Sequence, residues 1–201
     1  YNSLNTLKSF IEPDDNLIVF FAGHGSMNPI TNRGYWIPYE GTSDTSTWIE
    51  NSVIKDFVQD LDAHHVWLIA DSCFSGTFLT NTRDKTTQIS YEKIDQKKSR
   101  WMLSSGSEEK VSDGTPNKHI PFINYLIKYL KNNSNEFTSV SEIISYVKTL
   151  TQNNSIQTPR GAFIDNVGHA DGEMVLNLKE EFVEHNILIT RGKPNTPNFR
   201  L

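Results

Sequence analysis

The chain has 201 residues, of which 36% are hydrophobic, and a formal net charge of −5. This length fits one domain with a substantial core. The acidic balance argues against nucleic-acid binding, which requires a concentrated basic face, and no apolar stretch approaches the roughly 20 residues that span a bilayer. The single cysteine cannot form an intrachain disulfide, so we expect a reducing compartment, namely the cytoplasm.

The first fifty residues contain one helical pattern and one strand pattern. Apolar residues at helical spacing predict a helix over 4–11, which Pro13 ends. The continuous apolar run 17–22 is typical of a strand that is buried on both faces of a parallel sheet. Residues 27–50 are rich in turn formers, and we expect a loop there with one short extended piece at 35–38.

The middle of the chain repeats this alternation. The spacing of apolar residues predicts a helix over 53–61, and a second buried strand follows over 66–70. Residues 77–99 show almost no apolar periodicity and contain several basic residues, so we expect an exposed loop. A third strand over 101–103 ends in small residues.

The remaining elements complete an α/β pattern. Pro121 suits the first turn of a helix, and Ser139 with Glu142 has the spacing of a capping box at the start of another. A last strand is predicted over 174–178. Strands that alternate with helices predict an α/β sandwich around a mostly parallel sheet, with one domain over 1–178 and a C-terminal extension or linker over 179–201.

Two of the predicted strands end in reactive side chains. His24 follows the first strand between two glycines, and Cys73 follows the second. If these parallel strands are neighbours, both residues emerge at the same edge of the sheet, where ligands of such folds bind. An imidazole within reach of a thiol can take its proton, and the backbone N–H groups of Gly25 and Cys73 can donate to a developing oxyanion. Taken singly, Cys73 is typical of a small buried apolar residue, and His24 is typical of a turn. The joint pattern of the two residues favours nucleophilic catalysis.

These motifs resemble those of the caspase-like cysteine peptidases, and of the metacaspase branch most closely. The matching residues are Gly23-His24-Gly25, Asp71-Ser72-Cys73-Phe74-Ser75-Gly76 and, more weakly, the acidic stretch 105–113. The separation of 49 residues between His24 and Cys73 matches the known caspase spacing. The resemblance covers about 17–178.

The resemblance implies a three-layer caspase-like sandwich with a Cys–His dyad. Cys73 is then the nucleophile, His24 is the base and general acid, and the Gly25 and Cys73 amides form the oxyanion hole. The chain departs from the family in two respects. Phe74 stands where the family usually has histidine, and the two strands and one helix that precede the histidine strand in the family have no counterpart here.

The resemblance also implies cleavage after arginine or lysine. Metacaspases have an acidic residue two positions before the nucleophile, and Asp71 occupies that position. A carboxylate in a narrow pocket pairs bidentately with a guanidinium and rejects an acidic side chain. We expect Glu109 and Asp113 at the rim of this pocket. The alternative is that Asp71 caps a helix beginning near Ser72.

Two further features are left open by the sequence. The basic loop after Cys73 is either a solvated charge run or a region of self-cleavage, for which the candidate sites are Arg83, Lys85, Lys97 and Lys98. No cofactor is expected, although some metacaspases require calcium. The oxygen-bearing side chains considered before the nucleophile strand are Asp44, Glu50, Asn51, Asp56 and Asp60. The first three have no spacing that defines a calcium site.

The expected partners follow from the proposed protease. They are a protein substrate, a segment or separate chain that supplies the absent N-terminal strands, and a sensor or regulatory domain. Two rival functions remain: a catalytically inactive interaction module with this fold, and a cysteine hydrolase of small substrates. The second leaves Asp71 without a purpose.

Overall fold

A central sheet carries the architecture of the protein. The computed structural model describes residues 2–72, 79, 90–106 and 120–177. The sheet has the strand order β1-β5-β6-β8. Neighbours β1–β5 and β5–β6 are parallel, and β6–β8 is antiparallel. The bounds are β1 Asn16–Ala22, β5 His65–Asp71, β6 Ser99–Ser104 and β8 Arg160–Phe163.

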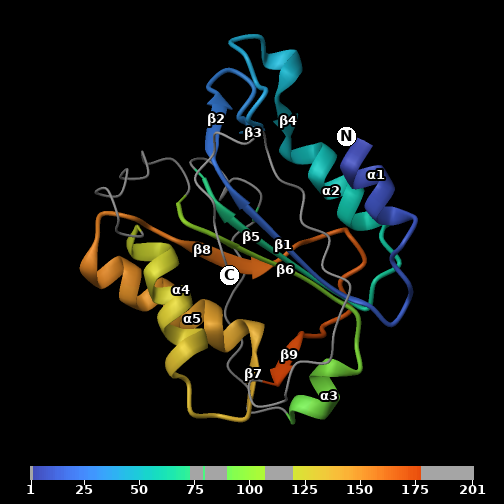
Figure 1. The fold of residues 1–201 in the computed structure, drawn as a ribbon, viewed down its shortest axis with the longest axis vertical. Coiled ribbons are helices and arrows are strands. Elements are labelled where there is room, and N and C mark those ends of the chain that lie inside the picture. The colour runs from blue at the N-terminus through green and yellow to red at the C-terminus, as the bar shows by residue number, and fades with distance from the viewer. Residues whose placement is uncertain (1, 73–78, 80–89, 107–119, 178–201) are drawn as a thin grey trace.

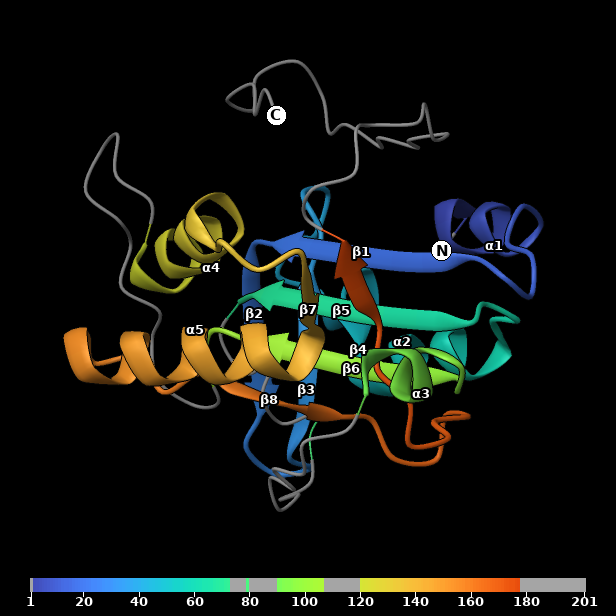
Figure 2. The ribbon, with the colours of Figure 1, turned by 90° about the horizontal axis from the view of Figure 1, so that it is seen from below.

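Helices cover both faces of this sheet, which gives the three layers that the sequence predicted (Figure 1). On one face lie α1 and α2; on the other lie α4 and α5, as Figure 2 also shows. A short helix, α3, connects to the start of β6. The helix bounds are α1 Asn2–Lys8, α2 Asn51–Asp60, α3 Tyr91–Asp95, α4 Pro121–Asn132 and α5 Val140–Asn154.

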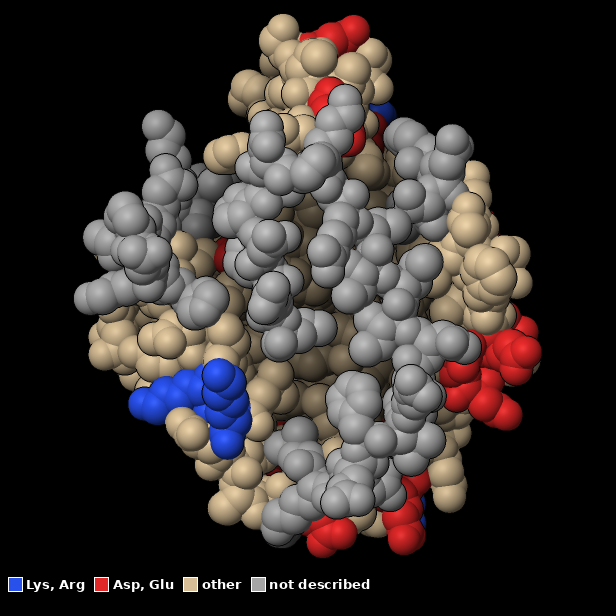
Figure 3. Space-filling model, in the orientation of Figure 1, with Lys and Arg blue, Asp and Glu red and all other residues tan. Residues whose placement is uncertain are grey.

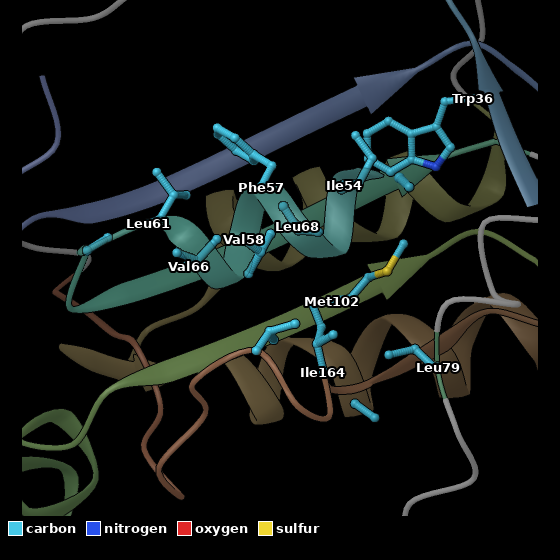
Figure 4. Packing of buried hydrophobic residues seen from close by; sticks show 14 residues of the cluster. Trp36, Ile54, Phe57, Val58, Leu61, Val66, Leu68, Leu79, Met102 and Ile164 are labelled. Carbon is cyan, nitrogen blue, oxygen red and sulfur yellow. The ribbon is translucent and has the colours of Figure 1, made fainter. Parts of the chain in front are cut away.

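Each face of the sheet has its own apolar cluster. Val66, Leu68 and Met102 point toward α2 and pack with its buried side chains, including Phe57 (Figure 4). The alternate residues of the same strands point the other way: Trp67, Ile69 and Leu103 pack against α4 and α5. The strand period of two thus distributes the residues of β5 between two cores, and all but its last residue are buried.

Two small antiparallel sheets flank the central one. The first, with the order β2-β3-β4, follows β1 directly and projects beyond the end of the central sheet (Figure 1). The second pairs β7 with β9. The bounds are β2 His24–Asn28, β3 Arg33–Ile37, β4 Ile49–Glu50, β7 Phe137–Ser139 and β9 Val175–Asn177, with a 3-10 helix at Thr45–Thr47.

The predicted helices over 4–11, 53–61 and from Pro121 are confirmed to within a few residues. The capping box is confirmed in full: the Ser139 side chain accepts from the Glu142 N–H, and the Glu142 carboxylate accepts from the Ser139 N–H at 2.8 Å. All three predicted strands of the central sheet are present. In the described part of the chain, no helix has both the length and the apolar character to cross a membrane.

Two predictions about elements were wrong. Strand β1 is not buried on both faces, because it lies at the edge of the sheet; its exposed side chains include Ile18 at 47% and Phe20 at 52%. Region 77–99 contains α3, anchored by the buried Ile94. The loop predicted over 27–50 is confirmed for most of its positions, and the extended piece predicted at 35–38 falls largely within β3. The strand predicted over 174–178 is present as β9, which pairs with β7.

Candidate active site

The register of β1 and β5 defines the edge at which the predicted reactive residues lie. In every pair the β5 residue stands 49 positions after its β1 partner, and the last pair is Ala22 with Asp71. The Gly23 N–H extends the ladder by donating to the Asp71 carbonyl at 3.2 Å. His24 and Cys73 are also 49 positions apart in the sequence, so each follows the last paired residue of its strand by two positions. Cys73 itself lies outside the described residues.

His24 begins the strand β2 instead of sitting in a free turn. It pairs with Ile37, and Gly25 pairs with Trp36. The His24 side chain is exposed. The chain changes from the central sheet to the small sheet within one residue, Gly23, directly before His24.

Aromatic packing stabilises the change of chain direction between β1 and β2. The rings of Phe21 and Trp36 stack with centroids 4.5 Å apart and an interplanar angle of 11°. Glycine at position 23 leaves room for this stacking, because a Cβ there would come within 2.9 Å of the Phe21 ring and the ring would have to shift. The buried Trp36 thus joins β3 to the end of β1 and supports the strand on which His24 lies. Sequence reasoning did not identify Trp36.

Asp71 ends β5 and is only partly exposed. Burial raises the pKa of its carboxyl from the ordinary 3.8 to about 6, and hydrogen bonding by the Ser105 side chain opposes this rise. The Oδ1 atom of Asp71 is buried and has no hydrogen-bond partner among the described residues. A buried carboxylate oxygen without a partner is costly, and an incoming cation would satisfy it.

Ser105 connects the ends of β5 and β6. It is fully buried, and its N–H donates to the Ala70 carbonyl at 3.0 Å. Its hydroxyl accepts from the Ser72 N–H at 3.1 Å. The residue directly before Cys73 is therefore held by a side chain of the neighbouring strand. The only signal in the sequence was a small polar residue at the predicted end of β6.

The other predicted site residues lie in different places. Glu109 and Asp113, predicted for the pocket rim, lie outside the described residues, as do the predicted self-cleavage sites Arg83 and Lys85. Lys97 and Lys98 precede β6, at the opposite end of the sheet from Asp71. The Lys98 Nζ pairs with Asp62 at 2.7 Å, and its carbonyl accepts from Ala170.

The carboxylates considered for calcium are not gathered in one place. Asp44 Oδ1 accepts from the Ser46 N–H, Glu50 pairs with Arg33, and Asp60 pairs with Lys8. The residues that the structure describes hold no group of three histidine, cysteine or acidic side chains suited to a metal ion. The expectation of no cofactor, with calcium dependence left open by the sequence, is not tested by this finding.

Surface charge adds little on the face seen in Figure 3. The described lysine and arginine side chains form one compact group there and otherwise show only as small patches at the margin, and the acidic side chains lie in several separate groups (Figure 3). The described atoms of this face thus present no broad basic surface.

The sequence of the chain matches a model of a known protein family. The model of the caspase domain matches residues 2–163, which is well over half of the chain. The match includes β1, β5 and β6 together with the positions of His24, Cys73 and Ser105. No curated protein matches the chain.

Proposed function

Because the chain belongs to the caspase-domain family of cysteine peptidases, we propose that it is an endopeptidase that cleaves proteins after arginine or lysine with a Cys73–His24 dyad. The observation that carries this proposal is the shared offset of 49 residues. In the sequence, His24 and Cys73 each come two positions after the last paired residue of two adjacent parallel strands, which supports the proposed dyad.

The proposed reaction proceeds through an acyl-enzyme. The Cys73 thiolate attacks the carbonyl carbon of the scissile bond, and the Gly25 and Cys73 amides donate to the resulting oxyanion. His24 gives a proton to the leaving amine as the C–N bond breaks. Water then attacks the thioester while His24 takes its proton, which releases the new carboxylate and restores the thiol.

The Asp71 carboxyl supports the basic specificity. It ends the strand that leads to Cys73, and its buried Oδ1 lacks a partner among the described residues. A guanidinium or ammonium group would satisfy that oxygen, whereas an acidic side chain would be repelled. Glu109 and Asp113 are proposed to add to the rim.

The edge strand β1 supports a further part of the proposal. Its outer edge has no strand partner in the described part of the chain, and Ile18 and Phe20 are half exposed. We propose that a preceding segment or a separate chain adds a strand there, and that such a partner or an attached sensor domain regulates activity. The cytoplasm remains the proposed compartment, since one cysteine suits a reducing environment.

The test uses peptides that differ only in the residue before the scissile bond: arginine, citrulline or aspartate. Citrulline is neutral and nearly isosteric with arginine. We expect the arginine peptide to be cleaved at least about tenfold faster than the citrulline peptide, as one charge-assisted contact predicts. Cys73→Ala and His24→Ala should abolish turnover, and Asp71→Asn should remove most of the preference for arginine.

The matched control is Asp62→Asn, which removes an exposed carboxylate at the opposite end of the sheet and should leave kcat/KM unchanged. Faster cleavage of the aspartate peptide would contradict the specificity. A wild-type protein that turns over no peptide and is not labelled by an arginine chloromethylketone would be an interaction module. Turnover of esters but not of peptides would indicate a hydrolase of small substrates.

A further inference from the structure

Residues 164–173, here called the strap, connect β8 to the segment before β9 and form turns rather than a helix or strand. The backbone of the strap binds the backbone at the start of β6. The Ile164 N–H donates to the Arg100 carbonyl at 2.8 Å, and the Ala170 N–H donates to the Lys98 carbonyl at 3.0 Å. The strap therefore lies along the residues that lead into β6.

The strap packs closely against the segment that contains Lys97 and Lys98. A Cβ at Gly172 would overlap the Lys97 carbonyl, and the Trp101 Nε1 donates to the Gly172 carbonyl at 3.0 Å. A protease cleaves a bond only after the residues around it have left their hydrogen bonds and become extended. The peptide bonds after the two lysines, which the sequence offers as self-cleavage sites, are therefore protected while the strap is in place.

His169 joins the strap to β6 through a hydrogen bond that depends on its protonation state. Its Nδ1 accepts from the Arg100 N–H at 3.1 Å. A backbone N–H can only donate, so this bond requires an Nδ1 without a proton. A protonated ring would place one N–H against another, and the amide of the buried Arg100 would lose its acceptor.

The His169 ring is half-buried, and aromatic side chains fix its position. It stacks on Phe163 of β8, with centroids 4.7 Å apart and an interplanar angle of 4°. It lies nearly perpendicular to Trp101 of β6, at a centroid distance of 6.1 Å. One imidazole thus attaches the strap to two neighbouring strands of the central sheet.

We propose that His169 is a pH-sensitive latch that holds the strap over the peptide bonds after Lys97 and Lys98, and that acid opens the strap and makes these bonds cleavable. The two lysines stand between α3 and β6, so cleavage there divides the chain between these elements. The proposal gives the lysine pair a role that the proposed dyad does not require.

The direction of the effect follows from the groups around His169. Burial is the largest influence and lowers the pKa of His169 below the ordinary 6.5. Arg100 of β6 also lowers this pKa, whereas Asp165 and Asp171 of the strap raise it. The closed strap binds the proton less tightly than the open strap does. The latch is therefore complete above pH 6.5 and weakens as the pH falls below that value.

The experiment digests the full chain with a lysine-specific endopeptidase at pH 7.5 and pH 5.5. The chain carries Cys73→Ala, so that no self-cleavage contributes. Mass spectrometry measures the cleavage rates after Lys97 and Lys98, each divided by the rate for a free peptide of residues 93–103 at the same pH. This division removes the pH dependence of the added protease. The bond after Lys128, in the middle of α4, reports general unfolding.

The normalised rates after Lys97 and Lys98 should rise by up to about tenfold from pH 7.5 to pH 5.5. One proton taken up on opening changes the open fraction tenfold per pH unit below 6.5, and the cleavage rate follows that fraction. His169→Asn keeps an acceptor near the position of Nδ1 but does not titrate, so it should remove the rise. His169→Ala should give fast cleavage at both pH values.

His64→Gln is the matched control. His64 is another half-buried histidine, and its Nε2 donates to the Asp95 carbonyl at 2.8 Å, at the end of α3. The glutamine amide keeps a donor there without titrating. This variant should retain the full rise after Lys97 and Lys98.

Rates that do not change with pH, or a rise that His169→Asn retains, overturn the proposal. An equal rise after Lys128 would show that acid unfolds the whole molecule, which also overturns it. Loss of the rise in His64→Gln would assign the pH sensitivity to the contact with α3 instead of the strap. If His169→Ala does not fold, the comparison of wild-type His169 with His169→Asn decides the question alone.

Discussion

The position of Asp71 in the fold makes its ionised carboxylate energetically unfavourable. A carboxylate that loses water without gaining a cation is destabilised, which is why the Asp71 pKa stands at about 6 instead of 3.8. The folded state then binds the proton more tightly than the unfolded chain does. The stability that this proton provides is complete below pH 3.8 and is lost as pH rises through about 6.

We therefore expect Asp71→Asn to stabilise the protein at neutral and alkaline pH while it reduces the preference for arginine. The shift from 3.8 to about 6 corresponds to at most about 3 kcal/mol at pH 8, and the gain should shrink to about half of that at pH 5. Urea unfolding of both proteins at the two pH values measures the difference.

The exposed Asp62 serves as the control for this prediction. Its pKa is lowered, chiefly by its hydrogen bond with Lys98, so any stability that it contributes is present at pH 8 and lost in acid. Asp62→Asn should therefore not stabilise the protein at pH 8. A gain for Asp71→Asn that did not change with pH would show that its cause is not the ionised carboxylate.

At the scale of helices and strands, hydrogen bonds of the Arg100 side chain link the end of α2 to the central sheet. Its guanidinium is buried and donates to the carbonyls of Leu61 and Ala63, which follow α2, and to those of His64 and Ser99. No carboxylate forms an ion pair with it in the described structure. Arg100 thus satisfies carbonyl groups that the turn between α2 and β5 would otherwise bury without donors.

Arg100→Met is expected to lower the free energy of unfolding by about 3 kcal/mol, because the buried carbonyls lose charged donors that water cannot replace. The measurement is urea unfolding at pH 7. Arg33→Met is the matched control: Arg33 is exposed and pairs with Glu50 at 3.2 Å, so its loss should cost less than about 1 kcal/mol. Equal costs for the two variants would contradict the role given to Arg100.

At the scale of the whole molecule, the open edge of the central sheet governs how the protein meets other chains. Strand β1 ends the strand order and presents Ile18 and Phe20 beside an edge that has no strand partner among the described residues. Such edges pair with further strands unless a charge or a covering element prevents it. The proposed partner strand would pair with this unpaired edge of β1.

We expect the chain, in the absence of such a partner, to associate in a concentration-dependent manner through β1. Phe20→Lys should reduce the association, because a charge on the edge strand opposes strand addition. Light scattering over a concentration series measures this effect. Ile30→Lys is the control, since Ile30 is 91% exposed but follows β2, away from the β1 edge. An equal effect of both variants would show general hydrophobic adhesion instead of edge pairing.

Local patterns in the sequence were sufficient for most of the helices and for the presence of the three parallel strands. The capping box at Ser139 and the helix from Pro121 depend on residues within one or two turns, and both are present as predicted. The small strands β2, β4 and β7 were not predicted, and only the short extended piece at 35–38 anticipated β3. The Trp36 ring of β3 stacks on Phe21, fifteen positions earlier, and no local pattern indicates this contact.

By itself, the sequence determined that His24 and Cys73 each follow the end of a strand within a few positions, because strand length and alternation are local properties. The equal offsets of the two residues came from the register of β1 and β5 in the structure. Only the tertiary structure decided that β1 is an edge strand and that the Ser105 hydroxyl accepts from the Ser72 N–H beside Asp71. Both depend on which strands lie side by side, and that order follows from packing of two cores against one sheet. The raised pKa of Asp71 follows from the same packing, since burial is a property of the folded molecule and not of the residue.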